Sequence, residues 1–138
     1  MNSLENTSLL VGRILMSVIF VHGGWGKLLG AAATQATFAK LGLPLPVVAW
    51  VIAVIVELGG GLLLLFGLFT RPVGLVLAAW CVATALIAHT NFAERIQEIQ
   101  FMKNMAMTGG FLYVFALGAG AYSLDAALGR RRAAPVPG

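Results

Sequence analysis

Four long apolar stretches, separated by short polar segments, constrain the fold of this chain more than any other feature of its sequence. A helix of about 20 residues crosses a hydrocarbon core of roughly 30 Å, and each stretch approaches that length. The third reaches it when Pro72 opens the helix and His89 closes it at the interface. The predicted spans are 9–29, 47–69, 72–89 and 105–124. We therefore predict an all-α membrane protein, a single four-helix transmembrane bundle over residues 1–138.

The composition excludes an ordinary soluble domain. Of the 138 residues, 59% are hydrophobic and only 10% are charged, whereas about a quarter of the residues in soluble domains are charged. A soluble fold of this size has too little interior to hide so much apolar surface. The net charge of +4 needs no nucleic-acid partner. The basic C-terminal tail, 125–138, is explained as a topology anchor that meets the anionic lipid of the bilayer.

The segments between the spans suggest how the helices connect. The tight turn at residues 70–72, Thr-Arg-Pro, makes the second and third spans antiparallel neighbours, and Pro44 and Pro46 mark the entry to the second. The alanines from Ala31 onward are expected to begin a loop. Residues 91–104 alternate apolar and charged faces at helical spacing, which predicts a short interfacial helix between helices three and four, roofing the outer end of the bundle.

The first span is expected to remain in the protein as a membrane helix. A cleaved signal peptide is disfavoured, because the leader MNSLENTS carries no basic residue and Arg13 interrupts the apolar run. The basic residues are divided almost evenly between the two sides. The cluster of three arginines, 130–132, directly beyond the last span favours cytoplasmic termini.

Glu57 is the clearest candidate for function, because an ionisable group at membrane depth is costly. It lies near the middle of the second span and precedes three glycines, which allow a helix or ligand to approach closely. It either handles a ligand or protons, or is protonated and only packs. Arg13 is its expected partner, since their offset of roughly 7 Å along the helices is within reach of a guanidinium.

The stretch FVHGGWGKLLG, 20–30, places polar residues and glycines at the outer end of the first span. Arg13 and Lys27 share one helical face, which we expect to be interior, while His22 lies on the opposite side. Lys27 either snorkels to the interface or faces a polar site. Together with His22 and His89 it falls in the outer third of the bundle, and we predict that the three line a polar pocket.

A seam at helical spacing follows the fourth span, and it suits either helix packing or a flat ligand. Its members are Asn104, Thr108, Phe111, Phe115, Gly118, Tyr122 and Asp125. The predicted aromatic lining is Phe111 and Phe115 with Trp25, although Trp25 also suits an interfacial aromatic belt. Asp125 is expected to pair with Arg13 or with the arginine tail.

Metal and haem chemistry find little support in the sequence. Cys81 is the single cysteine, so it forms no internal disulfide or thiol pair, and we expect it to pack in the core. Two histidines can ligate haem within a helical bundle. Haem is disfavoured here, because there is no CxxCH sequence and neither His22 nor His89 is deep. No metal and no covalently bound cofactor is predicted.

Taken in order, six features resemble the DoxX family of small bacterial integral membrane proteins. They are Arg13, the string HGGWGK at 22–27, ELGGGLLLLFGLFTR at 57–71, His89, Asn104, and GAGAYSLD at 118–125. The resemblance implies a multi-pass protein of the bacterial cytoplasmic membrane, linked to quinone chemistry or oxidative stress. It implies at most a subunit of a membrane oxidoreductase complex, since this chain lacks a soluble domain and a redox cysteine pair.

Three functions remain open on the sequence. The first is a quinone-binding membrane subunit, the second a non-catalytic scaffold for a soluble or membrane redox enzyme, and the third a small proton-coupled transporter. No catalytic residue is assigned. The residues predicted to bind a ligand or handle protons are Glu57, Arg13, His22, Lys27, His89 and Asn104.

Overall fold

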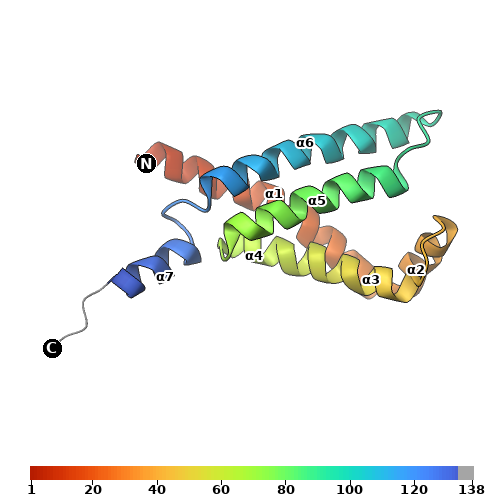
Figure 1. Cartoon of the computed structure of the whole chain (residues 1–138), viewed down its shortest axis with the longest axis horizontal. Helices are drawn as coiled ribbons and strands as arrows, with labels where there is room; N and C mark the ends of the chain where they lie inside the picture. The colour runs from red at the N-terminus through yellow and green to blue at the C-terminus, as the bar shows by residue number, and fades with distance from the viewer. Residues whose placement is uncertain (134–138) are drawn as a thin grey trace.

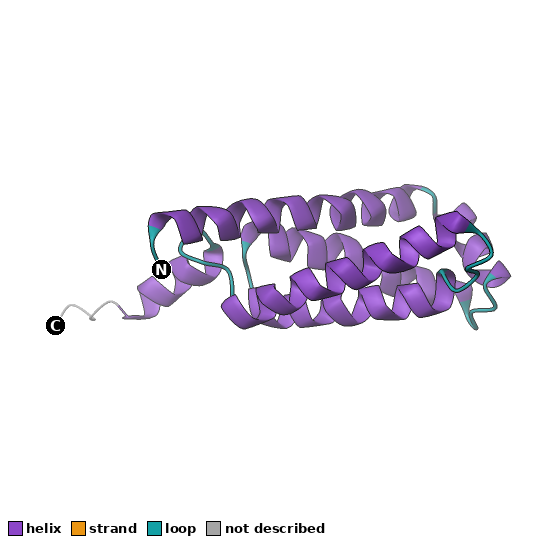
Figure 2. Cartoon of the chain, turned by 90° about the horizontal axis from the view of Figure 1, so that it is seen from above, coloured by secondary structure: helices purple, strands orange, loops and turns teal. Residues whose placement is uncertain are grey.

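The structure is a computed structural model that describes residues 1–133, and these residues are helical apart from short connections (Figure 1). The helices are α1 (Ser3–Leu29), α2 (Ala31–Lys40), α3 (Pro46–Val54), the π-helical turn η1 (Ile55–Gly59), α4 (Gly60–Phe66), α5 (Thr70–Ala88), α6 (Arg95–Leu117) and α7 (Leu124–Ala133). The long helices lie side by side (Figure 2), with α6 running antiparallel along α5.

Three helical stretches in the described residues are long and apolar enough to cross a membrane. They are Ser3–Leu29, Pro46–Phe66 and Thr70–Ala88. The predicted all-helical membrane protein agrees with this. Helix α6, which corresponds to the predicted fourth span, is not among these three stretches. Its first half is polar and carries Arg95, Glu98 and Lys103.

The predicted interfacial helix at 91–104 is wrong, because residues 95–104 form the first half of α6 itself. No proline interrupts this segment, and its Gln, Glu, Met and Lys residues favour continuous helix. The helix also ends earlier than predicted, at Leu117. Gly118 and Gly120 adopt φ of 78° and 75° there, a backbone conformation that favours glycine. The predicted tail begins within α7, and residues 134–138 lie outside the described residues.

A tight turn joins the second and third spans as predicted, but it lies at residues 67–69, because the predicted turn residues 70–72 belong to α5. Pro46 is the first residue of α3, and the span ends at Phe66, followed by Gly67 at φ 66°. Helix α5 then begins at Thr70, two residues before the predicted Pro72. Proline is tolerated at this third helical position, because the first four N–H groups of a helix have no intrahelical acceptor.

The core lies between α1, the second span, α5 and α6. It is built from Phe20, Leu64, Leu77, Cys81 and Phe111 with their neighbours. The rings of Phe20 and Phe111 meet edge to face, with centroids 5.2 Å apart, a favoured arrangement of aromatic pairs. Cys81 is buried and free, as expected.

Residues 31–40 form the short helix α2, so the expectation of a loop beginning at Ala31 is wrong. Four of the first six residues are alanine, the best helix former. Helix α2 folds back beside α3 at the end of the molecule where α3 and α5 diverge (Figure 1). This divergence opens the space that holds the candidate site.

Candidate functional site

The candidate site is built on the π-helical turn in the middle of the second span. Glu57 lies in this turn and is 8% exposed. Short π-helical turns within α-helices are frequent at functional sites. The turn approaches α1 very closely, since a Cβ placed on Gly24 would overlap the backbone N of Leu58 and lie 2.8 Å from its Cα.

Gly23 allows the Glu57 carboxylate the same close approach. A Cβ at this position would lie 3.1 Å from Glu57 Oε2, closer than side-chain packing normally permits. The paired glycines of HGGWGK therefore clear the space in which an acidic side chain of one span meets the backbone of another.

The Glu57 carboxylate is held by two donors from different helices. Lys27 Nζ of α1 lies 2.7 Å from Oε2 and forms a salt bridge, while Trp80 Nε1 of α5 donates to Oε1 at 3.1 Å. A charge at membrane depth needs such compensation. Trp50 Nε1 donates to the Lys27 carbonyl at 2.8 Å, which ties the end of α1 to α3. These bonds join α1, α5 and the second span around the ion pair of Lys27 and Glu57.

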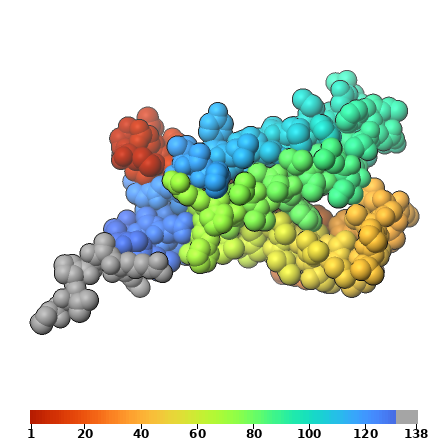
Figure 3. All heavy atoms as spheres, viewed as in Figure 1, coloured from red at the N-terminus to blue at the C-terminus, as the bar shows by residue number. Residues whose placement is uncertain are grey.

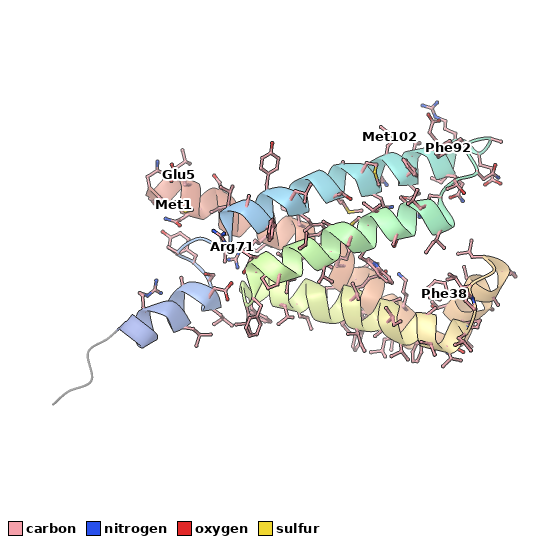
Figure 4. All side chains as sticks on the ribbon, in the orientation of Figure 1. Met1, Glu5, Phe38, Arg71, Phe92 and Met102 are labelled. Carbon is pink, nitrogen blue, oxygen red and sulfur yellow. The ribbon has the colours of Figure 1, made fainter. Side chains whose placement is uncertain are left out.

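A cavity of about 370 Å³ opens beside this pair, within the size range of small-molecule sites. Its polar lining residues are Lys27, Glu57, Trp80, His89, Thr37 and Thr84. The remaining lining is apolar and consists of Phe38, Leu41, Leu43, Ala49, Ile52, Ala83, Ile87 and Ala88. In Figure 3 the molecule is hollowed between the C-terminal end of α5 and helix α2. Figure 4 shows Phe38 at this end, on α2.

His89 lies at the C-terminal end of α5 and is oriented by α6. Its Nδ1 lies 2.7 Å from Oε1 of Gln97, and its backbone N–H donates to the Ala85 carbonyl. The ring therefore has one nitrogen engaged by α6 while the residue lines the cavity.

Three of the predicted ligand-binding residues come together in this cavity, and the others do not. Lys27, Glu57 and His89 line it. His22 is exposed on α1, and Asn104 is buried on α6, where its amide donates to the Gln100 carbonyl. The roof over the cavity is α2 with the following loop, in place of residues 91–104.

None of the predicted aromatic residues lines the cavity. Trp25 is 53% exposed, Phe115 is 42% exposed, and Phe111 lies in the core against Phe20. The aromatic lining residues are Phe38 and Trp80, which the sequence reasoning missed. The spacing of Trp80, Thr84, Ile87 and Ala88 places them on one face of α5, and this pattern is a signal that points to Trp80.

The predicted pair of Glu57 with Arg13 is wrong, because Glu57 meets Lys27. Among residues 1–130, whose side chains the structure describes, Lys27–Glu57 is the only salt bridge. Arg13 is 2% exposed and donates from Nη2 to the Tyr122 carbonyl at 2.6 Å. The inward face of α1 was predicted correctly. The predicted pair assumed that the midpoints of the first and second spans lie at the same depth, and they do not. Gly24 lies opposite Leu58, and Arg13 lies opposite Gly67.

Asp125 caps α5, instead of forming the expected pair with Arg13. The alternative pair with the arginine tail involves side chains, at 131–132, that lie outside the described ones. The Asp125 Oδ1 accepts from the Phe69 N–H at 2.8 Å, and its Oδ2 accepts from the Thr70 N–H at 2.9 Å. A carboxylate is favourable at the positive end of a helix dipole. This contact holds α7 against the turn between α4 and α5.

The fold and the site together define a helical membrane protein with an ion pair and a mainly apolar cavity between its helices. The chain belongs to the DoxX family, whose family model matches residues 8–90. This confirms the resemblance read from the sequence. The matched range contains every residue that lines the cavity, from Lys27 to His89. Helices α6 and α7 lie outside it.

Similar proteins are known from two bacteria. The chain is 42% identical to Inner membrane protein YqjF of Escherichia coli (strain K12) over 134 residues, which cover 95% of this chain and 99% of that protein. It is 37% identical to Inner membrane protein YphA of the same organism over 122 residues, or 85% and 87% of the two chains. Over 78 residues, 56% of this chain and 57% of the relative, it is 41% identical to the protein named Putative oxidoreductase CatD of Bacillus subtilis (strain 168). No solved structure matches the chain.

Proposed function

We propose that this chain is a membrane subunit of redox chemistry that binds a quinone-like ring compound in the cavity beside Lys27 and Glu57. One observation carries the proposal: Lys27, Glu57 and His89 line a single cavity whose other walls are mainly apolar. A ring compound with oxygen substituents needs an apolar slot and a few polar groups that fix its orientation. The cavity offers both.

Lys27 is the group proposed to hold a ligand oxygen. Its ammonium has three N–H donors and no acceptor. Glu57 Oε2 takes one of these donors, and the other two remain for a ligand. Because the Glu57 carboxylate balances the charge of the Lys27 ammonium, holding that charge at membrane depth costs less free energy. Trp80 and Phe38 supply aromatic surface on which a ring can stack.

The proposal includes the place of the protein in the cell. Two relatives are named inner membrane proteins, and a third is named as an oxidoreductase. We infer a multi-pass protein of the bacterial cytoplasmic membrane, with α6 as the fourth helix of a transmembrane bundle and both termini cytoplasmic. Electron transfer would then need a redox enzyme as partner, since the proposal assigns binding to this chain and no catalytic residue.

Binding of a short-chain hydroquinone, kept reduced under anaerobic conditions, to the full-length protein in lipid nanodiscs tests the proposal. His89→Leu removes a polar wall group, and His22→Leu is the matched control, because His22 is exposed on the other side of α1. We expect His89→Leu to weaken binding about tenfold, the equivalent of one lost hydrogen bond, and His22→Leu to leave it unchanged. Lys27→Met should weaken it at least as much.

Circular dichroism and thermal unfolding of each variant establish that the helices remain folded. If hydroquinone affinity is the same in wild type, His89→Leu and Lys27→Met, the cavity does not bind a quinone-like ring compound. The scaffold function would then be the better account of the protein.

A further inference from the structure

We propose that the cavity selects the reduced form of its ring ligand, a phenol or hydroquinone that donates a hydroxyl to His89 and presents its other oxygen to Lys27. This inference rests on the proposed function and specifies its substrate class. It follows from the hydrogen-bonding character of the two polar walls.

The first step is the protonation of the His89 ring. We assign it from the partner atom, because the acceptor at 2.7 Å from Nδ1 is the carbonyl oxygen of the Gln97 amide. In this orientation of the Gln97 amide the oxygen accepts a hydrogen bond, and we assign the proton to Nδ1 on that basis. In the neutral imidazole the other nitrogen, Nε2, then has a lone pair and acts as an acceptor.

The second step is whether this acceptor is available to a ligand in the cavity. His89 lines the cavity, and its Nε2 forms no hydrogen bond with residues 1–130, whose side chains are described. A ligand in the cavity therefore meets an acceptor at the His89 wall. It meets a donor at the other polar wall, where the Lys27 ammonium has two N–H groups that Glu57 does not use.

The third step is the match with the two oxidation states. A quinone has two carbonyl oxygens, both acceptors, so one of them would face the lone pair of Nε2 without a hydrogen bond. A hydroquinone or phenol donates its O–H to Nε2, and its second oxygen accepts from Lys27. Thr84 also lines the cavity, but its hydroxyl can donate or accept and does not discriminate.

A site that hydrogen-bonds a substrate hydroxyl discriminates strongly against the analogue that lacks it, since its own polar group is left unpaired. We expect the hydroquinone to bind at least tenfold more tightly than the matching quinone. For a two-electron couple, a tenfold preference for the reduced form raises the midpoint potential of the bound ligand by about 30 mV.

The test compares three ligands of one ring skeleton, the hydroquinone, the quinone and the hydroquinone dimethyl ether. Each is titrated anaerobically at pH 8 into the full-length protein in nanodiscs. Wild type should bind the hydroquinone at least tenfold more tightly than the other two. Equal affinities, or tighter binding of the quinone, would overturn the inference while leaving the proposed function intact. Absence of binding by all three would instead remove the proposed function.

Gln97 provides a matched pair of variants. Gln97→Leu removes the acceptor that fixes the His89 ring, so Nε2 can carry the proton and the preference for the hydroquinone should fall below threefold. Gln100→Leu is the control, because the Gln100 side chain forms no hydrogen bond in the described part of the chain, and it should keep the full preference. A full preference in Gln97→Leu contradicts the proposed role of the ring.

A measurement without ligand tests the first step directly. The chain has two histidines, so His22→Asn leaves His89 as the single one. Its ¹⁵N chemical shifts distinguish the two neutral tautomers. We expect protonation at Nδ1, and protonation at Nε2 in the wild-type surroundings would refute the assignment.

Discussion

Lys27 and Arg13 lie on one face of α1, yet the two ends of this helix put their basic side chains into opposite surroundings. Arg13 is enclosed by the Gly67 turn and the loop before α7, and its described hydrogen bond is to a backbone carbonyl. Lys27 meets a carboxylate and lines an open cavity. The basic group at the closed end is 2% exposed, and its Nε and Nη1 are buried without a hydrogen-bond partner among the described residues. The basic group at the open end lines a cavity, where its remaining donors can meet a ligand.

The largest effect on stability is expected at the closed end, from Gly67→Ala. Gly67 has φ 66°, and its added Cβ would overlap the Arg13 guanidinium and lie 2.6 Å from Ser123 Cβ. Backbone strain and overpacking together should lower the free energy of unfolding by about 3 kcal/mol. Unfolding in mixed SDS micelles measures this.

Gly26→Ala is the control for that variant, because nothing lies within 4 Å of its added Cβ. It should be neutral or slightly stabilising, since alanine favours helix over glycine by up to about 1 kcal/mol. A loss below 1 kcal/mol in Gly67→Ala would mean that the closed end is less tightly packed than the contacts indicate.

The ion pair at the open end is expected to give the next largest effect. Lys27→Met and Glu57→Gln should each cost about 2 kcal/mol, and the double variant should cost less than their sum by at least 1 kcal/mol, since each single change leaves the other group uncompensated. The cycle of Arg13→Met with Glu57→Gln should be additive within about 0.5 kcal/mol. Coupling in the second cycle but not in the first would mean that Glu57 pairs with Arg13 and not with Lys27.

A smaller effect is expected from Asp125→Ala, which removes the cap of α5. Loss of a helix cap costs about 1 kcal/mol. Ligand affinity should not change, because Asp125 belongs to the closed end of the molecule, where Figure 4 also places Arg71. Glu94→Ala is the comparison, as Glu94 precedes α6 without capping it through its side chain. If both variants unfold alike, the cap has no energetic role.

The smallest effect is expected from Trp50→Phe. It removes the indole bond to the Lys27 carbonyl while keeping most of the aromatic surface, and one hydrogen bond contributes about 1 kcal/mol. Trp25→Phe is the matched change at an exposed tryptophan and should leave the unfolding free energy as it is. A larger loss at Trp25 than at Trp50 would contradict the tie between α1 and α3.

Some features of the site could be predicted from the sequence and others could not. The face of α1 that carries Arg13 and Lys27 was identified correctly, because helical phase is a local property. The partner of Glu57 was not, because it depends on how far one span is shifted along another. Here the close approach of Gly24 to Leu58 sets that shift. The aromatic walls were missed for a related reason: α6 packs along α5 and contributes no residue to the cavity.

The sequence by itself determined a helical membrane protein of the DoxX family, with a tight turn before α5 and a buried Glu57. Composition, periodicity and ordered motifs are properties of the sequence, and they can be recognised without knowing which residues lie close together in space. Only the tertiary structure decided that Lys27 is the partner of Glu57, that Trp80 completes the site, and that α2 covers it. These contacts depend on the register between helices and on the π-helical turn that presents Glu57. Both are fixed by packing between segments far apart in the chain, which no local pattern encodes.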